Sequence, residues 1–296
     1  MNDPHPPRLR SATPGTEPGG RLSPASGRGE DRVSPLPLEE VGAPRAPGEG
    51  PLHGLTALVT GGGKGIGLAV ARRLAADGAA LAIIGRDEAA LAGAADALGA
   101  RHEVADVTDR DALRKAMAAL GPCDILINNA GAAVSKPFLK HRPRDFQAML
   151  AVNLFAAVTA CQAALPAMRA RGFGRIVNVA STAGLKGYAY VTAYVAAKHA
   201  LVGFTRALAL ETARDGVTVN AVCPGFTDTE MVARSAVTIA ASSGRSTEEA
   251  RALLARGNPA GRLVRPEEVA EAVAFLCRRD ASAMTGQAVA VACGEV

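Results

Sequence analysis

Short aliphatic runs alternate with longer stretches of helical periodicity from Leu55 to the last residue of the sequence. In the longer stretches apolar residues recur three and four positions apart, as at Leu113, Met117 and Leu120, which predicts helices with one buried face. The aliphatic runs contain few polar residues, as is typical of parallel strands covered on both faces. The alternation therefore predicts a single α/β domain with a doubly wound parallel sheet. Seven runs are the expected strands: Leu55–Thr60, Ala80–Ile84, Arg101–Ala105, Asp124–Ile127, Arg175–Ala180, Val217–Val222 and Ala288–Val291.

Residues 1–50 differ in composition from the rest of the chain, since they hold ten of its 18 prolines. Such a segment buries too little apolar surface to offset the entropy of ordering it. We therefore expect a disordered tail over 1–50 and one domain over 51–296. A translation start placed too far upstream is the alternative explanation. The segment has neither the apolar core of a secretory signal nor the acid-poor composition of a mitochondrial presequence.

Composition narrows the class of protein. Hydrophobic residues make up 48% of the chain, but none of the apolar runs reaches the roughly 18 uninterrupted residues of a membrane span. The five cysteines are scattered and form no C-x-x-C pair, which argues against disulfides or a zinc site and favours the cytoplasm. The five histidines show no metal-ligand spacing. The net charge is +5, but the basic residues are interleaved with acids, so we expect no nucleic-acid partner, no membrane partner and no metal.

The first predicted strand leads directly into a glycine-rich turn, and a helical pattern follows the turn. Glycines at this place allow a tight turn and let backbone N–H groups approach a pyrophosphate at the positive end of the helix. A plain turn is the alternative. The candidate phosphate-binding residues are Thr60, Gly61, Gly63, Lys64, Gly65, Ile66 and Gly67.

The spacing T-G-x-x-x-G-x-G departs from the G-x-G-x-x-G fingerprint of other dinucleotide-binding proteins. In this spacing the sequence resembles the short-chain dehydrogenase/reductase family, from about Leu55 to the C-terminus. The resemblance implies a Rossmann-type fold with strand order 3-2-1-4-5-6-7 and a nicotinamide cofactor. It also implies a homotetramer.

The end of the second predicted strand bears on the choice of cofactor. An NAD-binding protein usually places a carboxylate there to accept the ribose hydroxyls. This chain has Gly85 followed by Arg86, and a guanidinium matches a phosphate better than a bare ribose. Lys64 offers a second positive charge. NADP(H) is therefore the preferred cofactor, while Asp87 keeps NAD(H) open.

Further positions match the family's motifs, and their roles are those that the resemblance implies. Asp106 and Val107 resemble its adenine-contacting pair, and Asn129, Ala130 and Gly131 belong to an N-N-A-G motif that lines the cofactor crevice. After the sixth strand, the P-G segment and the residues that follow it are assigned to the nicotinamide end of the site. They are Pro224, Gly225, Thr227 and Thr229.

Tyr194 and Lys198 lie four residues apart in a helical stretch, so both side chains share one helix face. A phenol has a pKa near about 10, and a nearby cation stabilises its phenolate. The alternative is that both are surface residues without a catalytic role, because tyrosine and lysine are common on protein surfaces at this spacing. Neither Tyr188 nor Tyr190 has a lysine four residues further on, so Tyr194 is the candidate proton donor.

Two more residues match the catalytic motif of the family. Ser181 precedes Tyr194 by thirteen residues, the offset of the family's Ser-Tyr-Lys triad, and is assigned the hydrogen bond to the substrate oxygen. Asn153 matches the helix asparagine that holds a proton-relay water beside the lysine. The resemblance implies that Lys198 and Tyr194 also contact the cofactor, and that the lysine lowers the tyrosine pKa.

The sequence says less about the substrate than about the cofactor. We expect the pocket to be formed by Ala132–Phe138, the loop Thr182–Tyr190 and a lid over about 227–257. Ser246 and Glu249 in this lid have the spacing of a capping box and predict a helix start. The run Thr205–Met231 is similar to 3-oxoacyl-thioester reductases and polyketide ketoreductases, which suggests a β-keto thioester.

The expected function is therefore an NADPH-dependent reduction of a ketone, on a carbonyl or acyl-thioester substrate. Asp215 argues against an acyl carrier protein, because similar reductases often have a basic docking residue there. A coenzyme A thioester and a free ketone stay open. The alternatives are an NAD-dependent 3-hydroxyacyl or alcohol dehydrogenase working oxidatively, and a non-catalytic NADP-sensing regulator. The latter commonly lacks the tyrosine or lysine that is present here.

Overall fold

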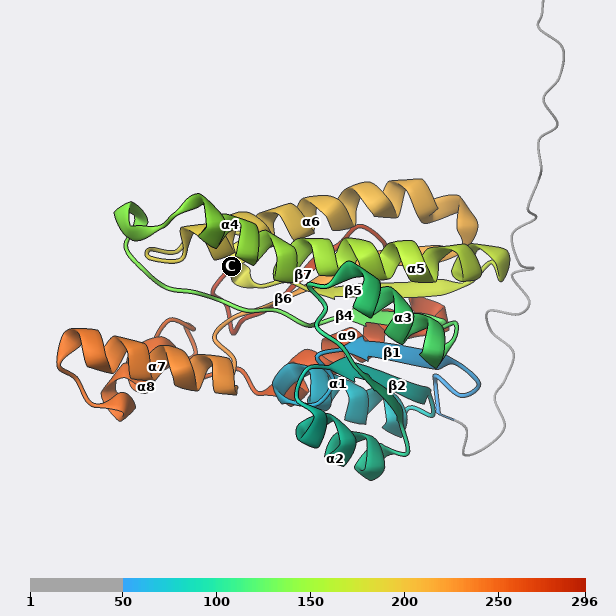
Figure 1. The fold of residues 1–296 in the computed structure, drawn as a ribbon, viewed down its shortest axis with the longest axis horizontal. Coiled ribbons are helices and arrows are strands. Elements are labelled where there is room, and N and C mark those ends of the chain that lie inside the picture. Colours follow the sequence, from blue (N-terminus) through green and yellow to red (C-terminus); the bar gives the residue numbers. More distant parts are fainter. Residues whose placement is uncertain (1–49) are drawn as a thin grey trace, which may run out of the picture. The chain divides into compact units, whose positions relative to one another are not determined.

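The computed structural model describes residues 50–296, so the predicted tail lies outside the described residues except for Gly50. In this part of the chain seven parallel strands form one sheet in the order β3-β2-β1-β4-β5-β6-β7 (Figure 1). The predicted fold class and strand order are thus confirmed. The strands are β1 Thr56–Thr60, β2 Ala80–Gly85, β3 Arg101–Val104, β4 Ile125–Asn128, β5 Gly174–Val179, β6 Val217–Pro224 and β7 Ala288–Val291.

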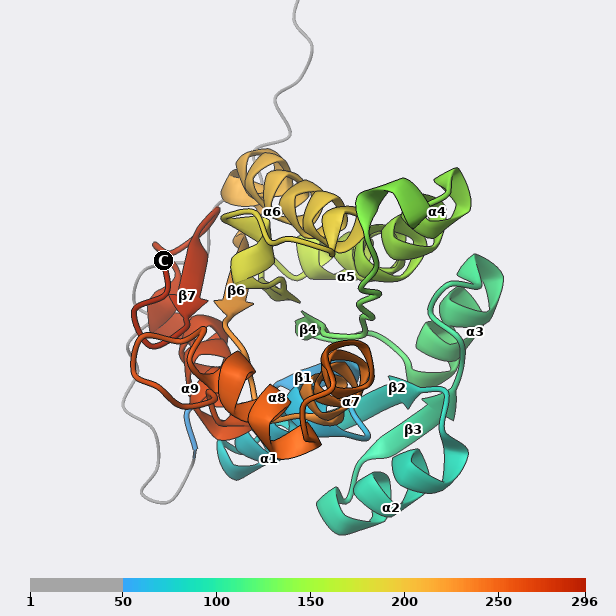
Figure 2. The ribbon, with the colours of Figure 1, turned by 90° about the vertical axis from the view of Figure 1, so that its left-hand side faces the viewer.

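Helices cover both faces of the sheet, with α1 and α9 on one side and α5 and α6 on the other (Figure 2). Successive residues of β1 point to opposite faces, so Val59 belongs to the core beneath α1 and α9 while Leu58 belongs to the core beneath α3 and α5. The described helices are α1 Gly65–Ala76, α2 Glu88–Leu98, α3 Arg110–Leu120, α4 Pro143–Leu150, α5 Ala156–Ala170, α6 Thr192–Thr212, α7 Glu230–Ser243, α8 Thr247–Ala255 and α9 Pro266–Cys277.

The helical stretch Pro143–Ala170, which comprises α4, a π-helical turn and α5, is long and apolar enough by composition to cross a membrane, since an 18-residue window within it has a mean hydropathy of 1.8. The sequence expectation of no such span considered uninterrupted apolar runs only. A core helix of a soluble protein meets the same criterion, and α5 contributes Ala160, Cys161 and Met168 to the hydrophobic core over β4 and β5.

A buried cation lies at the amino ends of the strands. Arg175 at the start of β5 is 3% exposed, and its guanidinium lies over the ring of Phe173, 4.4 Å from the centroid. It donates to four backbone carbonyls, those of Gly174, Gly216, Arg278 and Arg279, at 2.9–3.3 Å. Burial lowers the pKa of Arg175 to about 10. The hydrogen bonds tie β5 to the end of α9.

We predict that Arg175→Met lowers the free energy of unfolding by about 2–4 kcal/mol, because it leaves several buried carbonyls without this donor. Urea unfolding followed by circular dichroism measures the loss. Arg279→Met is the matched control, since Arg279 also lies over Phe173, at 4.8 Å, and its replacement keeps the bonds of Arg175. A loss for Arg175→Met no larger than that of the control would contradict the role assigned to the buried guanidinium.

Candidate active site

The four predicted catalytic residues meet at the carboxyl ends of the central strands. Ser181 follows β5, Tyr194 and Lys198 lie on α6, and Asn153 lies in the π-helical turn Ala151–Phe155. All four line one cavity of about 320 Å³, together with residues from the glycine turn and from the segment after β6. Motifs that are far apart in the sequence, from the glycine turn to the segment after β6, therefore describe one site in space.

The glycine turn has the close packing that a phosphate cradle needs. A Cβ on Gly67 would lie 2.1 Å from the carbonyl oxygen of Gly61, so only glycine lets α1 begin this close to the end of β1. Gly61 and Gly65 both have positive φ, at 67° and 52°. Lys64 at the N-cap of α1 makes no side-chain capping bond, so this helix end keeps backbone N–H groups for a ligand. A dinucleotide pyrophosphate fits this arrangement.

Three predicted turn residues do not line the cavity. Thr60 is buried behind it, and its hydroxyl accepts hydrogen bonds from the N–H groups of Asn129 and Ala130 at 3.0 and 3.2 Å. Gly63 and Gly67 form the turn itself. Thr60 thus joins the glycine turn to the N-N-A-G motif, whose Asn129, Ala130 and Gly131 do line the cavity.

The cations expected to meet a 2′-phosphate are already paired with acids. Lys64 Nζ lies 2.7 Å from the carboxylate of Asp87, and Arg86 lies 3.5 Å from that of Asp106. Asp87 also caps α2 by accepting from Ala90 N–H. The hydrogen bond with Lys64 holds the pKa of Asp87 below its ordinary value. All four charged groups lie at the exposed rim, so a phosphate competes with carboxylates in a well-solvated place.

Lys198 is 4% exposed, and its ammonium donates to the carbonyl oxygen of Val179 at the end of β5, at 2.8 Å. The ammonium lies 5.8 Å from the centre of the Tyr194 ring. Burial lowers the pKa of Lys198 to about 8. The pKa of Tyr194 is raised by burial, which outweighs the lowering hydrogen bond from Ser181. This direction differs from the expected lowering, because removal from water disfavours the phenolate.

Asn153 is held where α4 passes into α5. Its amide nitrogen donates to the carbonyls of Ala132 and Met149 at 2.9 and 3.0 Å, and its oxygen accepts from Ala132 N–H. A Cβ on Gly131 would lie 2.8 Å from the Asn153 oxygen and 3.6 Å from Lys198 Nζ. Asn153 and Lys198 therefore both lie beside Gly131 in the loop after β4. The π-helical turn, a feature frequent at functional sites, places Asn153 there.

The proposed lid segment contains α7 and α8, which lie at the left of Figure 1, on the same side as α4. The predicted capping box of Ser246 and Glu249 is confirmed at the start of α8. Glu230, Met231, Val232 and Arg234 of α7 line the cavity, although the sequence analysis did not single them out. Asp228 and Arg251 form an ion pair of 2.7 Å within this segment.

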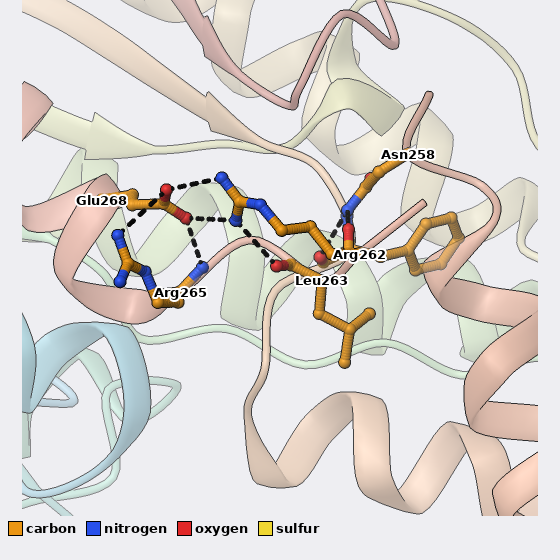
Figure 3. Close-up of polar contacts among 6 residues, drawn as sticks. Asn258, Arg262, Leu263, Arg265 and Glu268 are labelled. Atoms are coloured by element: carbon orange, nitrogen blue, oxygen red, sulfur yellow. Dashed lines mark hydrogen bonds and ion pairs between the residues drawn. The ribbon is translucent and has the colours of Figure 1, made fainter. Parts of the chain in front are cut away.

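Both ends of this segment are fastened together, a feature that the sequence does not reveal. Asn258 is fully buried, and its amide donates to the carbonyls of Phe226 and Arg262 while its oxygen accepts from Phe226 N–H (Figure 3). Thr227 and Val264 form a β-bridge beside it. Glu268 accepts from both terminal nitrogens of Arg262, which lowers the pKa of its carboxyl to about 2. These contacts hold the two ends of the segment together at the base of α7 and α8.

The comparisons with known proteins agree with this geometry. The sequence matches the short chain dehydrogenase family over residues 55–279. It is 40% identical over 245 residues to D-beta-hydroxybutyrate dehydrogenase of Cupriavidus necator, covering 79% of this chain and 95% of that protein. It is 38% identical over 245 residues to acetoacetyl-CoA reductase of Shinella zoogloeoides, covering 81% and 97%. A crystal structure of an actinorhodin polyketide ketoreductase variant with NADPH superposes with a TM-score of 0.79 at 39% identity, covering 81% of this chain and 97% of that one.

With its fold, its site and these relatives, the chain belongs to the short-chain dehydrogenase family. It is an oxidoreductase that acts on CH–OH or C=O groups.

The depressed pKa of Lys198 predicts how stability depends on pH. Between about pH 8 and the ordinary lysine value the unfolded chain holds a proton that the folded chain has released, so the contribution of this residue to stability rises with pH. Below about pH 8 its burial penalty, on the order of 3 kcal/mol, is fully present. We predict that Lys198→Met is more stable than wild type at pH 7, and that this advantage shrinks between about pH 8 and pH 10.

Thermal or urea unfolding of both proteins over this pH range measures the difference. The comparison cancels Cys123, Cys161 and Cys277, whose pKa values burial also raises and which titrate alike in both proteins. Both proteins carry Cys223→Ala, because the charge of Lys198 lowers the pKa of Cys223 and the two residues titrate together. A difference that stays constant from pH 7 to pH 10 would show that the folded protein keeps the lysine charged throughout.

Proposed function

We propose that this enzyme reduces a ketone with NADPH, and that the substrate is a 3-oxoacyl thioester or a polyketide-like carbonyl. The observation that carries the proposal is the placement of Ser181, Tyr194 and Lys198 around one cavity that continues to the glycine turn. A sensor protein would not need a proton donor and a buried lysine at this point. The actinorhodin ketoreductase neighbour, whose structure includes NADPH, and the acetoacetyl-CoA reductase relative support the choice of direction.

The residues that would hold the cofactor follow from the cavity. Gly61, Gly65 and Ile66 would bind the pyrophosphate at α1, while Asp106 and Val107 would contact the adenine end. Asn129, Ala130 and Gly131 also line the cavity. So do Pro224, Gly225, Thr227 and Thr229, which would hold the nicotinamide end of the cofactor. When bound, the cofactor supplies the hydride.

Side chains of the protein would supply the proton and stabilise the negative charge that develops on the carbonyl oxygen. Ser181 donates a hydrogen bond to the carbonyl oxygen, and Tyr194 delivers a proton to it. Burial keeps the phenol protonated at neutral pH, which suits a proton donor in the reductive direction. The Lys198 ammonium, fixed by the Val179 carbonyl, would bind the ribose hydroxyls and return a proton to Tyr194 through water beside Asn153.

The substrate choice rests on fewer contacts. Asp215, the position expected to dock an acyl carrier protein, is ion-paired with Arg169 at 2.6 Å, which neutralises a cation that such an acidic partner would use. This pairing favours a coenzyme A thioester or a free ketone. The hydroxybutyrate dehydrogenase relative favours the oxidative direction. The second candidate function is therefore the oxidation of an alcohol, for which we propose NAD as the cofactor. We also propose a cytoplasmic homotetramer built through α5 and α6, and a lid role for 227–257.

We predict that Tyr194→Phe lowers kcat at least about 1,000-fold, because the carbonyl oxygen loses its proton donor. Steady-state oxidation of NADPH with acetoacetyl-CoA and with cyclic ketones measures the effect. Isothermal titration should give a cofactor Kd within about twofold of wild type, since the phenol makes a small part of the binding surface. A variant that turns over at the wild-type rate would remove Tyr194 from the reaction.

We predict that Arg86→Ala weakens NADPH binding by about 10- to 100-fold, which corresponds to the loss of a charge-assisted contact of about 1.5–3 kcal/mol. The Kd for NADH should change by less than about twofold. Arg72→Ala, which removes an exposed positive charge from α1, is the control for net charge. Equal losses of affinity for NADPH and NADH would mean that Arg86 does not bind the 2′-phosphate of NADPH. This result would favour the oxidative candidate function.

A further inference from the structure

The segment after β7 turns back toward the loop Thr182–Tyr190. Cys293 and Gly294 both have left-handed backbone conformations, with φ of 53° and 88°. A left-handed conformation costs a non-glycine residue on the order of 1 kcal/mol or more, so other contacts must offset it at Cys293. The reversal directs the next residue, Glu295, into the protein, where its side chain is 3% exposed.

Glu295 is the centre of a polar network that holds this loop. One carboxylate oxygen accepts a hydrogen bond from the Tyr188 hydroxyl and lies 3.2 Å from Lys186 Nζ. The lysine also donates to the backbone carbonyl of Glu295 at 3.2 Å. The Tyr188 hydroxyl lies 2.6 Å from the hydroxyl of Thr182, the neighbour of Ser181 in the chain. A chain of hydrogen bonds thus runs from Glu295 to the residue next to the catalytic serine.

The same carboxylate also reaches the segment after β6. Its second oxygen is buried, has no hydrogen-bond partner among the described residues, and lies 3.1 Å from where a Cβ on Gly225 would be. The Tyr188 ring packs edge-on against Phe226, with 6.0 Å between the centroids. Gly225 lines the cavity and Phe226 begins the fastened base of α7 and α8. Glu295 therefore lies between the loop Thr182–Tyr190 and the segment after β6, whose Gly225 lines the cavity.

We propose that Glu295 is a positioning residue for substrate reduction, holding the loop Thr182–Tyr190, and through it Ser181, in the conformation that receives the ketone. The inference rests on the proposed function for its catalytic consequence. A buried carboxylate with one unpaired oxygen is costly and adds little stability by itself. Its contacts connect the loop that follows Ser181 with Gly225, which lines the cavity, and this connection gives the buried carboxylate a role.

The test uses Glu295→Gln, which keeps the shape and loses the charge, and Tyr188→Phe, which removes only the hydroxyl. Both should lower kcat/KM for a ketone about tenfold, while the Kd for NADPH stays within about twofold, because the network orders the substrate loop and not the cofactor cradle. The double variant should be no worse than Glu295→Gln by more than about twofold, since both changes break one network. Glu271→Gln on α9, which breaks an ion pair with Arg73 remote from this network, should leave kcat/KM unchanged.

Hydrogen exchange gives a readout that does not depend on activity. The amides of 182–190 should exchange faster in Glu295→Gln and in Tyr188→Phe than in wild type or in Glu271→Gln. If exchange in this loop is unchanged, or if the variants lose thermal stability while keeping wild-type kcat/KM, the positioning role is wrong. If wild type reduces no ketone but the amides of 182–190 still exchange faster in the variants, the proposed function is wrong while the anchoring of the loop by Glu295 is supported.

Discussion

Parallel strands all end at the same edge of a sheet, and the functional residues of this protein depend on that constraint. β1, β4, β5 and β6 are covered on both faces, so a ligand reaches their backbone only where they end. The chain leaves β1 toward β2 and β3, and returns on the other side to form β4. The connections after β1 and β4 therefore diverge, and a crevice opens between them. The glycine turn and the N-N-A-G motif lie on its two sides, joined by the Thr60 hydroxyl.

At both ends of the strands a buried cation donates hydrogen bonds to backbone carbonyls. At the amino edge Arg175 is surrounded by backbone carbonyls, and at the carboxyl edge Lys198 donates to the carbonyl of Val179. The guanidinium has four carbonyl partners and keeps its proton at any physiological pH. The ammonium has one carbonyl partner, and burial lowers its pKa to about 8. This difference in solvation suits the arginine to a structural role and the lysine to proton exchange.

The substrate side is organised by contacts between distant parts of the chain. Asn258 and Phe226 close the base of α7 and α8, while Glu295 joins the loop after β5 to the segment after β6. Between these contacts, Met231 and Val232 of α7 line the cavity.

The amino-acid sequence by itself determined the strand positions to within one or two residues, because buried parallel strands appear as uninterrupted aliphatic runs. It also determined the glycine turn and the Tyr194–Lys198 pair, since close packing and helical spacing are local requirements. Tertiary structure decided the rest. The bond between Tyr188 and Glu295 joins residues 107 positions apart, and the pairing of Lys64 with Asp87 depends on how α1 and α2 pack. The raised pKa of Tyr194 likewise reflects burial, which is the sum of all neighbours and which no local pattern encodes.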